Sequence, residues 1–174
     1  NTEGFDNFTH INGDHLEGFT NADVRVIQRQ SGTTTIVPRI MCEQFSNAEW
    51  VSLFLFGFTT LTDDSFRGCS RIWHLDLRLN RINSLTGNSF ATLGALTYLD
   101  LDQNAITHLP ENIFTSQVNL VTLDLRNNPY QSIPGSALSN LPSLVTLNIN
   151  NGRIREMNRD WFTNTPRLRT LNFV

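Results

Sequence analysis

Charged side chains recur at a fixed interval in the middle of the sequence, and they are the residues best placed to do chemistry. Asp76, Asp100 and Asp124 lie 24 residues apart, and the positions two residues further on carry Arg78, Asp102 and Arg126. Such carboxylates either pair with the neighbouring arginines as a solvated ladder or recognise a basic partner. We expect no metal site, because nothing nearby completes a closed set of ligands.

Nucleophilic catalysis would require a serine or cysteine beside a histidine and an acid. His74 and Asp76 are two residues apart, but no serine or cysteine is placed to complete such a set. The other histidines, His10, His15 and His108, are scattered. The sequence also lacks a phosphate-binding loop and zinc-site spacing. We therefore expect a protein that is not an enzyme and needs no cofactor.

The composition narrows the possible partners. The chain has 174 residues, of which 39% are hydrophobic, enough for one domain with a continuous core. Its net charge is −3, and all 13 basic residues are arginine. No basic block is dense enough to indicate nucleic-acid binding, and no apolar run is long enough to span a membrane.

An internal repeat shows which elements position these residues. Leu75, Leu99, Leu123, Leu147 and Leu171 are each 24 residues apart. Within the unit "LTYLDLDQNAITHLPENIF", from Leu96 to Phe114, the apolar residues are spaced 3, 2, 5, 3 and 5 apart, which fits neither a helix nor a strand. One coil of a solenoid explains this spacing: a short strand, a bend and an irregular return all turn apolar residues inward, and stacking buries them.

The pattern L-x-x-L-x-L-x-x-N-x-I-x-x-L is that of a leucine-rich repeat. We predict an α/β solenoid, a horseshoe with a parallel concave sheet and an irregular or short-helical convex side, of about 6–7 repeats. Residues 1–22 are off-pattern and would cap the first coil, and residues 23–174 would form the repeat domain. The last repeat is truncated and uncapped, so its open edge either continues into a longer array or is covered by a partner, such as a second copy.

Two coils depart from the pattern at the turn after the strand. Asn80, Asn104 and Asn128 hold this place, where the amide can bond backbone groups of its own coil and the next. Gly152 holds it in a later unit. The unit beginning at Trp50 is interpreted as two residues short, with Leu53 aligned on Leu75 and the Asn deleted. Both coils should turn differently.

A column of aromatic residues recurs on the return side of the coils. Phe66, Phe90, Phe114 and Phe162 share one position, and Leu138 is the exception. We expect a stacked apolar spine there rather than a ligand site.

Leucine-rich repeat proteins usually bind through exposed residues of the concave strands. With the alignment above, Phe54 and Phe56 face solvent there, beside His74, Leu79 and Tyr98, as aromatic residues of a binding hot spot would. Alternatively, the N-terminal segment folds over them. The expected partner-binding residues are Phe54, Phe56, His74, Asp76, Arg78, Tyr98, Asp100, Asp102, Asp124 and Arg126.

The two cysteines fall on the same alignment. Cys42 is 16 residues after Val26, and Cys69 is 16 residues after Leu53. Stacked coils are about 4.8 Å apart at the strands, within the usual Cα separation of a disulfide. We predict a Cys42–Cys69 disulfide between the first two coils; two buried free thiols in a cytosolic protein are the alternative.

The units "LTYLDLDQNAITHLPENIF" and "SFRGC" resemble extracellular leucine-rich repeat proteins, namely Toll-type receptor ectodomains and the leucine-rich immune proteins of mosquitoes. The resemblance implies a secreted or receptor-borne scaffold that binds another protein in innate immunity. Asn7-Phe8-Thr9 would then be a glycosylation site. A membrane-receptor ectodomain and an intracellular adaptor remain the alternatives.

Overall fold

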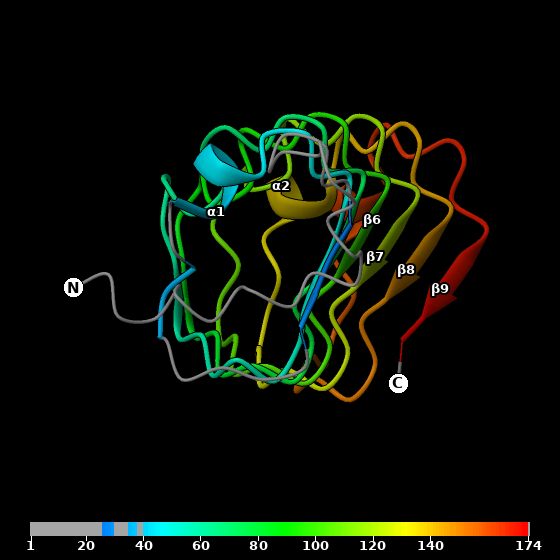
Figure 1. Ribbon diagram of the computed structural model, residues 1–174. Helices are drawn as coiled ribbons and strands as arrows, with labels where there is room; N and C mark the ends of the chain where they lie inside the picture. The colour runs from blue at the N-terminus through cyan, green and yellow to red at the C-terminus, as the bar shows by residue number, and fades with distance from the viewer. Residues whose placement is uncertain (1–25, 30–34, 38–39, 174) are drawn as a thin grey trace.

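The chain folds into a solenoid whose strands form one parallel sheet. The computed structural model describes residues 26–29, 35–37 and 40–173, and Figure 1 shows the coils stacked behind one another, with β6 to β9 side by side. The seven-stranded sheet has the order β1-β2-β4-β6-β7-β8-β9. Its strands are β1 (Val26–Arg29), β2 (Trp50–Leu53), β4 (His74–Asp76), β6 (Tyr98–Asp100), β7 (Thr122–Asp124), β8 (Thr146–Asn148) and β9 (Thr170–Asn172).

Among the described residues, the return side of the coils contains only short elements. A second sheet pairs β3 (Thr60–Leu61) with β5 (Ser84–Leu85). The helices are α1 (Ile40–Gln44), α2 (Gly135–Leu138) and the 3-10 helix η2 (Arg159–Phe162). None of the helices in the described ranges is long and apolar enough to cross a membrane. The predicted N-terminal cap, residues 1–22, and Asn7 lie outside the described residues.

The repeating leucines form one interior row, as predicted. Each pairs in register with its counterpart in the next strand, and the members that lie fully inside the solenoid are at most 1% exposed: Val51, Leu75, Leu99, Leu123 and Leu147. Burying a side chain of this size contributes about 1.5–3 kcal/mol. No coil could cover this row alone, so stacking stabilises the fold.

The register of β2 corrects one prediction. Val51, not Leu53, pairs with Leu75, and Trp50 pairs with His74. The unit is therefore not shortened, and Phe56, rather than a deletion, stands in the register of Asn80. Phe56 is 3% exposed, so the prediction that it faces solvent is wrong. The error arose because Val51 and Leu53 point to the same side of the strand, and side-chain alternation cannot tell the two registers apart.

The asparagines connect successive coils through backbone groups that the sheet does not pair. Asn104 Nδ2 donates to the carbonyl oxygens of Leu77 and Leu101, at 3.0 Å each, and its Oδ1 accepts from the Ile82 amide. Asn128 repeats this arrangement one coil later. The bonds therefore join each coil to the preceding coil, not to the following one as predicted. Buried polar backbone groups are satisfied in this way.

The two exceptional coils do turn differently. Where Phe56 replaces Asn, Asn80 Oδ1 of the next coil accepts the amides of Phe56, Gly57 and Phe58. Where Gly152 replaces Asn, the Tyr130 hydroxyl of the preceding coil lies 3.0 and 2.9 Å from the carbonyl oxygens of Leu125 and Ile149, and its one proton is shared between them. These are the two carbonyls that an Asn at 152 would reach. A Cβ at Gly152 would overlap the Tyr130 ring, so the two residues form a matched pair.

The aromatic spine is confirmed for three of its four phenylalanines. Phe66, Phe90 and Phe114 are buried, with ring centroids 6.2 and 5.8 Å apart. Phe162 is 38% exposed, so its inclusion was wrong. Trp161 lies inside instead, and its Nε1 donates to the Ile133 carbonyl.

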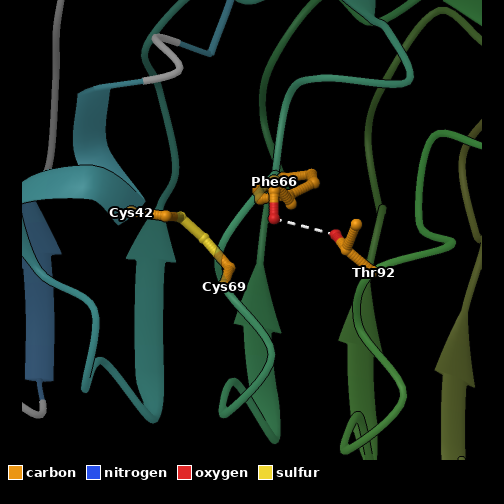
Figure 2. The surroundings of a disulfide bond; sticks show 4 residues. All are labelled: Cys42, Phe66, Cys69 and Thr92. Carbon is orange, nitrogen blue, oxygen red and sulfur yellow. Dashed lines mark hydrogen bonds between the residues drawn. A yellow bond between two sulfur atoms is a disulfide. The ribbon is translucent and has the colours of Figure 1, made fainter.

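Cys42 and Cys69 form a disulfide that joins α1 to the return segment of the next coil (Figure 2). Their Cα atoms are 5.2 Å apart. Counted from the paired strand residues, Cys42 stands in the register of Phe66 rather than of Cys69. The disulfide itself was predicted correctly. The prediction assumed, however, that Cys42 and Cys69 hold equivalent positions in successive coils, and they do not. The helical turn of α1 brings Cys42 to its partner.

Candidate functional site: the outer face of the sheet

Side chains that alternate with the interior leucines form the outer face of the sheet, the surface predicted to be concave and to bind partners. Its N-terminal half carries aromatic rings and leucines beside the Asp76–Arg78 pair, and its C-terminal half carries threonines and asparagines. We call Trp50, Phe54, Leu55, His74, Leu79 and Tyr98 the aromatic patch. We call Thr122, Asn127, Thr146, Asn148, Asn151, Thr170 and Asn172 the polar half.

Three aromatic rings stack across neighbouring strands of the aromatic patch. The His74 ring lies 3.6 Å from that of Trp50 and 4.4 Å from that of Tyr98, with nearly parallel planes. The stack forms because these residues are paired in register on β2, β4 and β6. Burial lowers the pKa of His74, against the opposing effect of Asp76. The imidazole is therefore neutral at physiological pH, and the stack is uncharged.

Two of the repeated carboxylates have cationic partners. Asp76 lies 3.2 Å from Arg78 Nε and accepts from the Ser52 hydroxyl at 3.0 Å. Asp124 lies 2.8 Å from Arg126 Nη2 and also accepts from Arg126 Nε. Both carboxylates are about one-twentieth exposed. The predicted Arg–Asp pairing is therefore present at these two positions, but each pair lies within one coil rather than across strands, and the carboxylates are buried rather than solvated.

Asp100, between them, has no such partner. It is 4% exposed, and no arginine among the described residues lies within 4 Å of it. It accepts hydrogen bonds from the Tyr98 hydroxyl at 3.2 Å and from the Asp102 amide at 2.9 Å. Burial, together with the charges of Asp124 and Asp76, raises the pKa of Asp100 to about 6. Burial and the nearby Asp100 also raise the pKa of Tyr98 to about 12.

Hydrogen bonds join the asparagines of the polar half to one another and to two aspartates. Asn172 donates to Asn148, which donates to Asp124 at 2.9 Å. In a second row, Asn151 donates to Asn127 at 3.0 Å, and Asn127 donates to Asp102 at 2.7 Å. These ladders align because each residue is one coil from its partner. The amide groups engaged in this way are not available to a partner.

Two leucines of the aromatic patch have an unusual backbone conformation. Leu55 and Leu79 have φ angles of 62° and 59°, in the left-handed region, and are 48% and 36% exposed. The equivalent residues of later coils are Gln103, Asn127 and Asn151. Beside them, the Arg78 guanidinium lies 5.4 Å from the ring centroid of half-buried Phe54, within the range of a cation–π contact.

Most residues predicted for this surface do lie together on it. His74, Asp76, Arg78, Tyr98, Asp100, Asp102, Asp124 and Arg126 occupy neighbouring strands and the turns that follow them. Phe54 stands in the register of Arg78 rather than of Asp76, and Phe56 is interior. Sequence reasoning missed Trp50 and Leu55. Counting 24 residues back from His74 and Leu79 finds both.

No group of three potential metal ligands occurs in the part of the chain that the structure describes. The arrangement consists of rings, aliphatic side chains and carboxylates on a wide surface, which suits binding rather than catalysis.

Comparison with known proteins agrees with this architecture. The family model described as "Leucine rich repeat" matches residues 56–106, 95–154 and 118–173. The chain belongs to the leucine-rich repeat family, whose members are typically recognition modules rather than enzymes. A search of curated proteins finds no match.

Several solved structures share the fold. The crystal structure of an APL1 leucine-rich repeat domain is 23% identical with a TM-score of 0.81, covering 91% of this chain and 41% of that one. An LRIM1/APL1C complex is 24% identical with a TM-score of 0.75, covering 82% and 26% of the two chains. A TLR13–ssRNA13 complex is 26% identical with a TM-score of 0.75, covering 82% and 21%. This chain thus spans less than half the length of each.

Proposed function

We propose that this chain is an extracellular recognition module of innate immunity that binds a protein partner through the aromatic patch. The observation that carries the proposal is the pair Leu55 and Leu79. Their left-handed backbone costs roughly 1–2 kcal/mol per residue for a side chain that lacks the local hydrogen bonds of Asn. Their exposure to water stabilises nothing in the isolated chain. Contact with a partner offsets both costs.

The adjoining rings support the same surface. Trp and Tyr are enriched among the residues that dominate binding energies. Trp50, His74 and Tyr98 are pre-organised by stacking, so little side-chain entropy remains to be lost on association. The polar half has no comparable feature, because it carries no ring and its asparagines are engaged with one another.

A protein partner is favoured over nucleic acid by the charge of the outer face. From β4 to β7 it carries four carboxylates, Asp76, Asp100, Asp102 and Asp124, against two guanidinium groups, Arg78 and Arg126. Phosphates would be repelled by this balance. RNA is the ligand in the TLR13 complex, and this charge balance argues against carrying that ligand over.

The Cys42–Cys69 disulfide supports an extracellular setting, because disulfides persist in oxidising compartments. Glycosylation at Asn7 belongs to the same proposal and is checked by mass spectrometry of protein from a secretory host. The second candidate is a fragment of a Toll-type receptor ectodomain, favoured by the similarity to TLR13. An intracellular adaptor would instead carry reduced cysteines.

The variant Leu55→Asn/Leu79→Asn tests the patch without disturbing the fold. It copies Asn127 and Asn151, which adopt the same backbone conformation. We expect the unfolding free energy to rise by about 1 kcal/mol, because the left-handed strain is relieved. Urea unfolding measures this gain.

Binding is measured by biolayer interferometry against purified secreted proteins and receptor ectodomains. We expect at least one protein to bind, with affinity falling by about tenfold or more in the double variant. Val118→Asn, at an exposed valine on the return side, is the control and should leave affinity unchanged. Unchanged affinity in the double variant would refute the assignment.

A further inference from the structure

We propose that the surface between Tyr98 and Asp124 binds a basic side chain, arginine or lysine, presented by the protein partner. This inference rests on the proposed function and specifies the chemistry of the partner. Three independent features of the outer face meet at this point: a missing arginine, an uncompensated carboxylate and a free aromatic face.

The missing arginine is seen by comparing equivalent positions. The positions two residues after Asp76 and Asp124 carry Arg78 and Arg126, each in contact with its aspartate. The equivalent position after Asp100 carries Asp102. The coil between two neutralised coils therefore has two carboxylates and no guanidinium. A partner side chain would supply the cation that this coil lacks.

The carboxylate pair is only weakly compensated from neighbouring coils. Asp102 lies 3.9 Å from Arg126 Nη2, but that nitrogen is 2.8 Å from Asp124 and is directed there. Asp102 accepts otherwise from two amides, Asn127 at 2.7 Å and Gln103 at 3.3 Å. Asp100 has only the Tyr98 hydroxyl and a backbone amide. A buried carboxylate without a cation is costly, and a bound cation would offset this cost.

The aromatic face is provided by Tyr98, the last ring of the stack. One face of this ring packs on His74. The next residue in register is Thr122, whose side chain is short and carries a methyl and a hydroxyl group rather than a ring. A guanidinium or ammonium group placed above Thr122 can approach the free face of Tyr98 while reaching toward Asp100. Cation–π contact adds about 0.5–2 kcal/mol in such a position.

Charge complementarity also selects the occupant. The outer face from β4 to β7 has a net charge of −2, four carboxylates against two arginines, with His74 neutral. A negative face steers a positively charged segment toward it and raises the association rate. A free metal ion fits less well, because no group of three ligands is found in the described chain.

The test uses a phage-displayed library of random dodecapeptides selected on the intact protein. We expect the selected peptides to be enriched in Arg or Lys flanked by apolar residues. Replacing the basic residue of the best peptide with citrulline or norleucine should weaken binding by about tenfold or more. A selection dominated by neutral or acidic peptides would overturn the inference.

The matched protein variant is Asp100→Asn/Asp102→Asn. It copies Asn148 and Asn150, the equivalent residues of a later coil, so we expect it to fold; far-ultraviolet circular dichroism checks this. Its affinity for the basic peptide should be lower than that of the parent protein by about tenfold or more. The control, Asp64→Asn/Glu111→Gln, changes net charge equally at exposed residues outside the sheet and should bind as the parent does.

The possible outcomes separate this inference from the proposed function. Binding that Leu55→Asn/Leu79→Asn abolishes but Asp100→Asn/Asp102→Asn does not would refute the basic-residue site and leave the aromatic patch standing. Binding unaffected by either variant would refute both. Competition of the peptide by single-stranded RNA on the same surface would also overturn the proposed partner class. If the control variant lost as much affinity for the peptide, net charge alone would explain the effect, and the inference of a specific site would be overturned.

Discussion

The two halves of the outer face share a backbone but differ in chemistry. In both halves, strands of equal register hold an interior leucine row, and the same positions point outward. In the first half those positions carry Trp50, His74 and Tyr98, whereas Thr146 and Thr170 occupy them in the second. The aromatic patch leaves apolar surface and strained leucines uncovered, while the polar half bonds to itself. Because the fold depends on the interior residues and the turns rather than on the outward positions of the strands, those positions are free to differ.

Individual coils also differ at the turn after the strand. Asn80, Asn104 and Asn128 close the earlier coils, and the Tyr130 hydroxyl replaces the Asn that Gly152 lacks. The same backbone carbonyls need donors in each case. Two different side chains solving this problem show that the donor, rather than the residue type, is required.

The largest expected effect tests whether the Tyr130 hydroxyl is equivalent to the turn asparagine of the earlier coils. Gly152→Asn should destabilise the chain by about 3 kcal/mol or more, because the new side chain overlaps the Tyr130 ring. The double variant Tyr130→Ile/Gly152→Asn restores the arrangement of the earlier coils, and we expect it to recover most of that loss. Urea denaturation of both single variants and the double variant gives the coupling energy. Additive effects would show that Tyr130 does not replace the Asn.

A smaller effect on stability should distinguish the aromatic patch from the polar half. Trp50→Ala should reduce the unfolding free energy by about 2 kcal/mol, because it removes a partly buried ring and its stacking on His74. Thr146→Ala, in the same column of the polar half, should change it by less than about 0.5 kcal/mol. Exposure of His74 should also raise its pKa toward the ordinary value, which an NMR titration measures. Similar losses in both variants would contradict the comparison.

The smallest expected effect is a pH dependence of stability that comes from Asp100, at the boundary between the two halves. Since the pKa of Asp100 is raised from 3.8 to about 6, the folded chain binds more protons than the unfolded chain between these values. The contribution of this group to stability therefore increases as pH falls from 7 through 6 toward 4. Asp100→Asn should remove this pH dependence.

At pH 7 the same variant should stabilise the chain by about 1–2 kcal/mol, because it removes a buried charge that no cation offsets but still buries a polar amide in its place. Asp124→Asn is the contrasting variant. It leaves Arg126 without its main partner and should not stabilise the chain. Thermal unfolding across this pH range measures both effects. If Asp124→Asn also stabilised the chain, the contrast between Asp124, which has an arginine partner, and Asp100, which has none, would be contradicted.

Much of the fold could be predicted from the repeat. The leucine row, the parallel sheet, the buried phenylalanines 66, 90 and 114, and the special turn at Gly152 all followed from 24-residue spacing. The turn at Phe56 was expected to be special for the wrong reason, a deletion that the structure does not contain. The register of β2 did not, because apolar residues occupy Val51, Leu53 and Leu55, and a shift of two residues leaves the pattern unchanged. That shift concealed Trp50 and misplaced Phe54 and Phe56, so the predicted patch had the right location with partly wrong members.

The sequence by itself determined that the chain repeats and which residues lie inside, since burying a leucine in each coil requires a fixed periodicity. It also placed carboxylates and rings on one surface. Only the tertiary structure decided which rings stack, which aspartate lacks an arginine and which hydroxyl replaces an asparagine. These relations depend on contacts between coils, and such contacts are decided by hydrogen-bonded register and packing that periodicity does not specify.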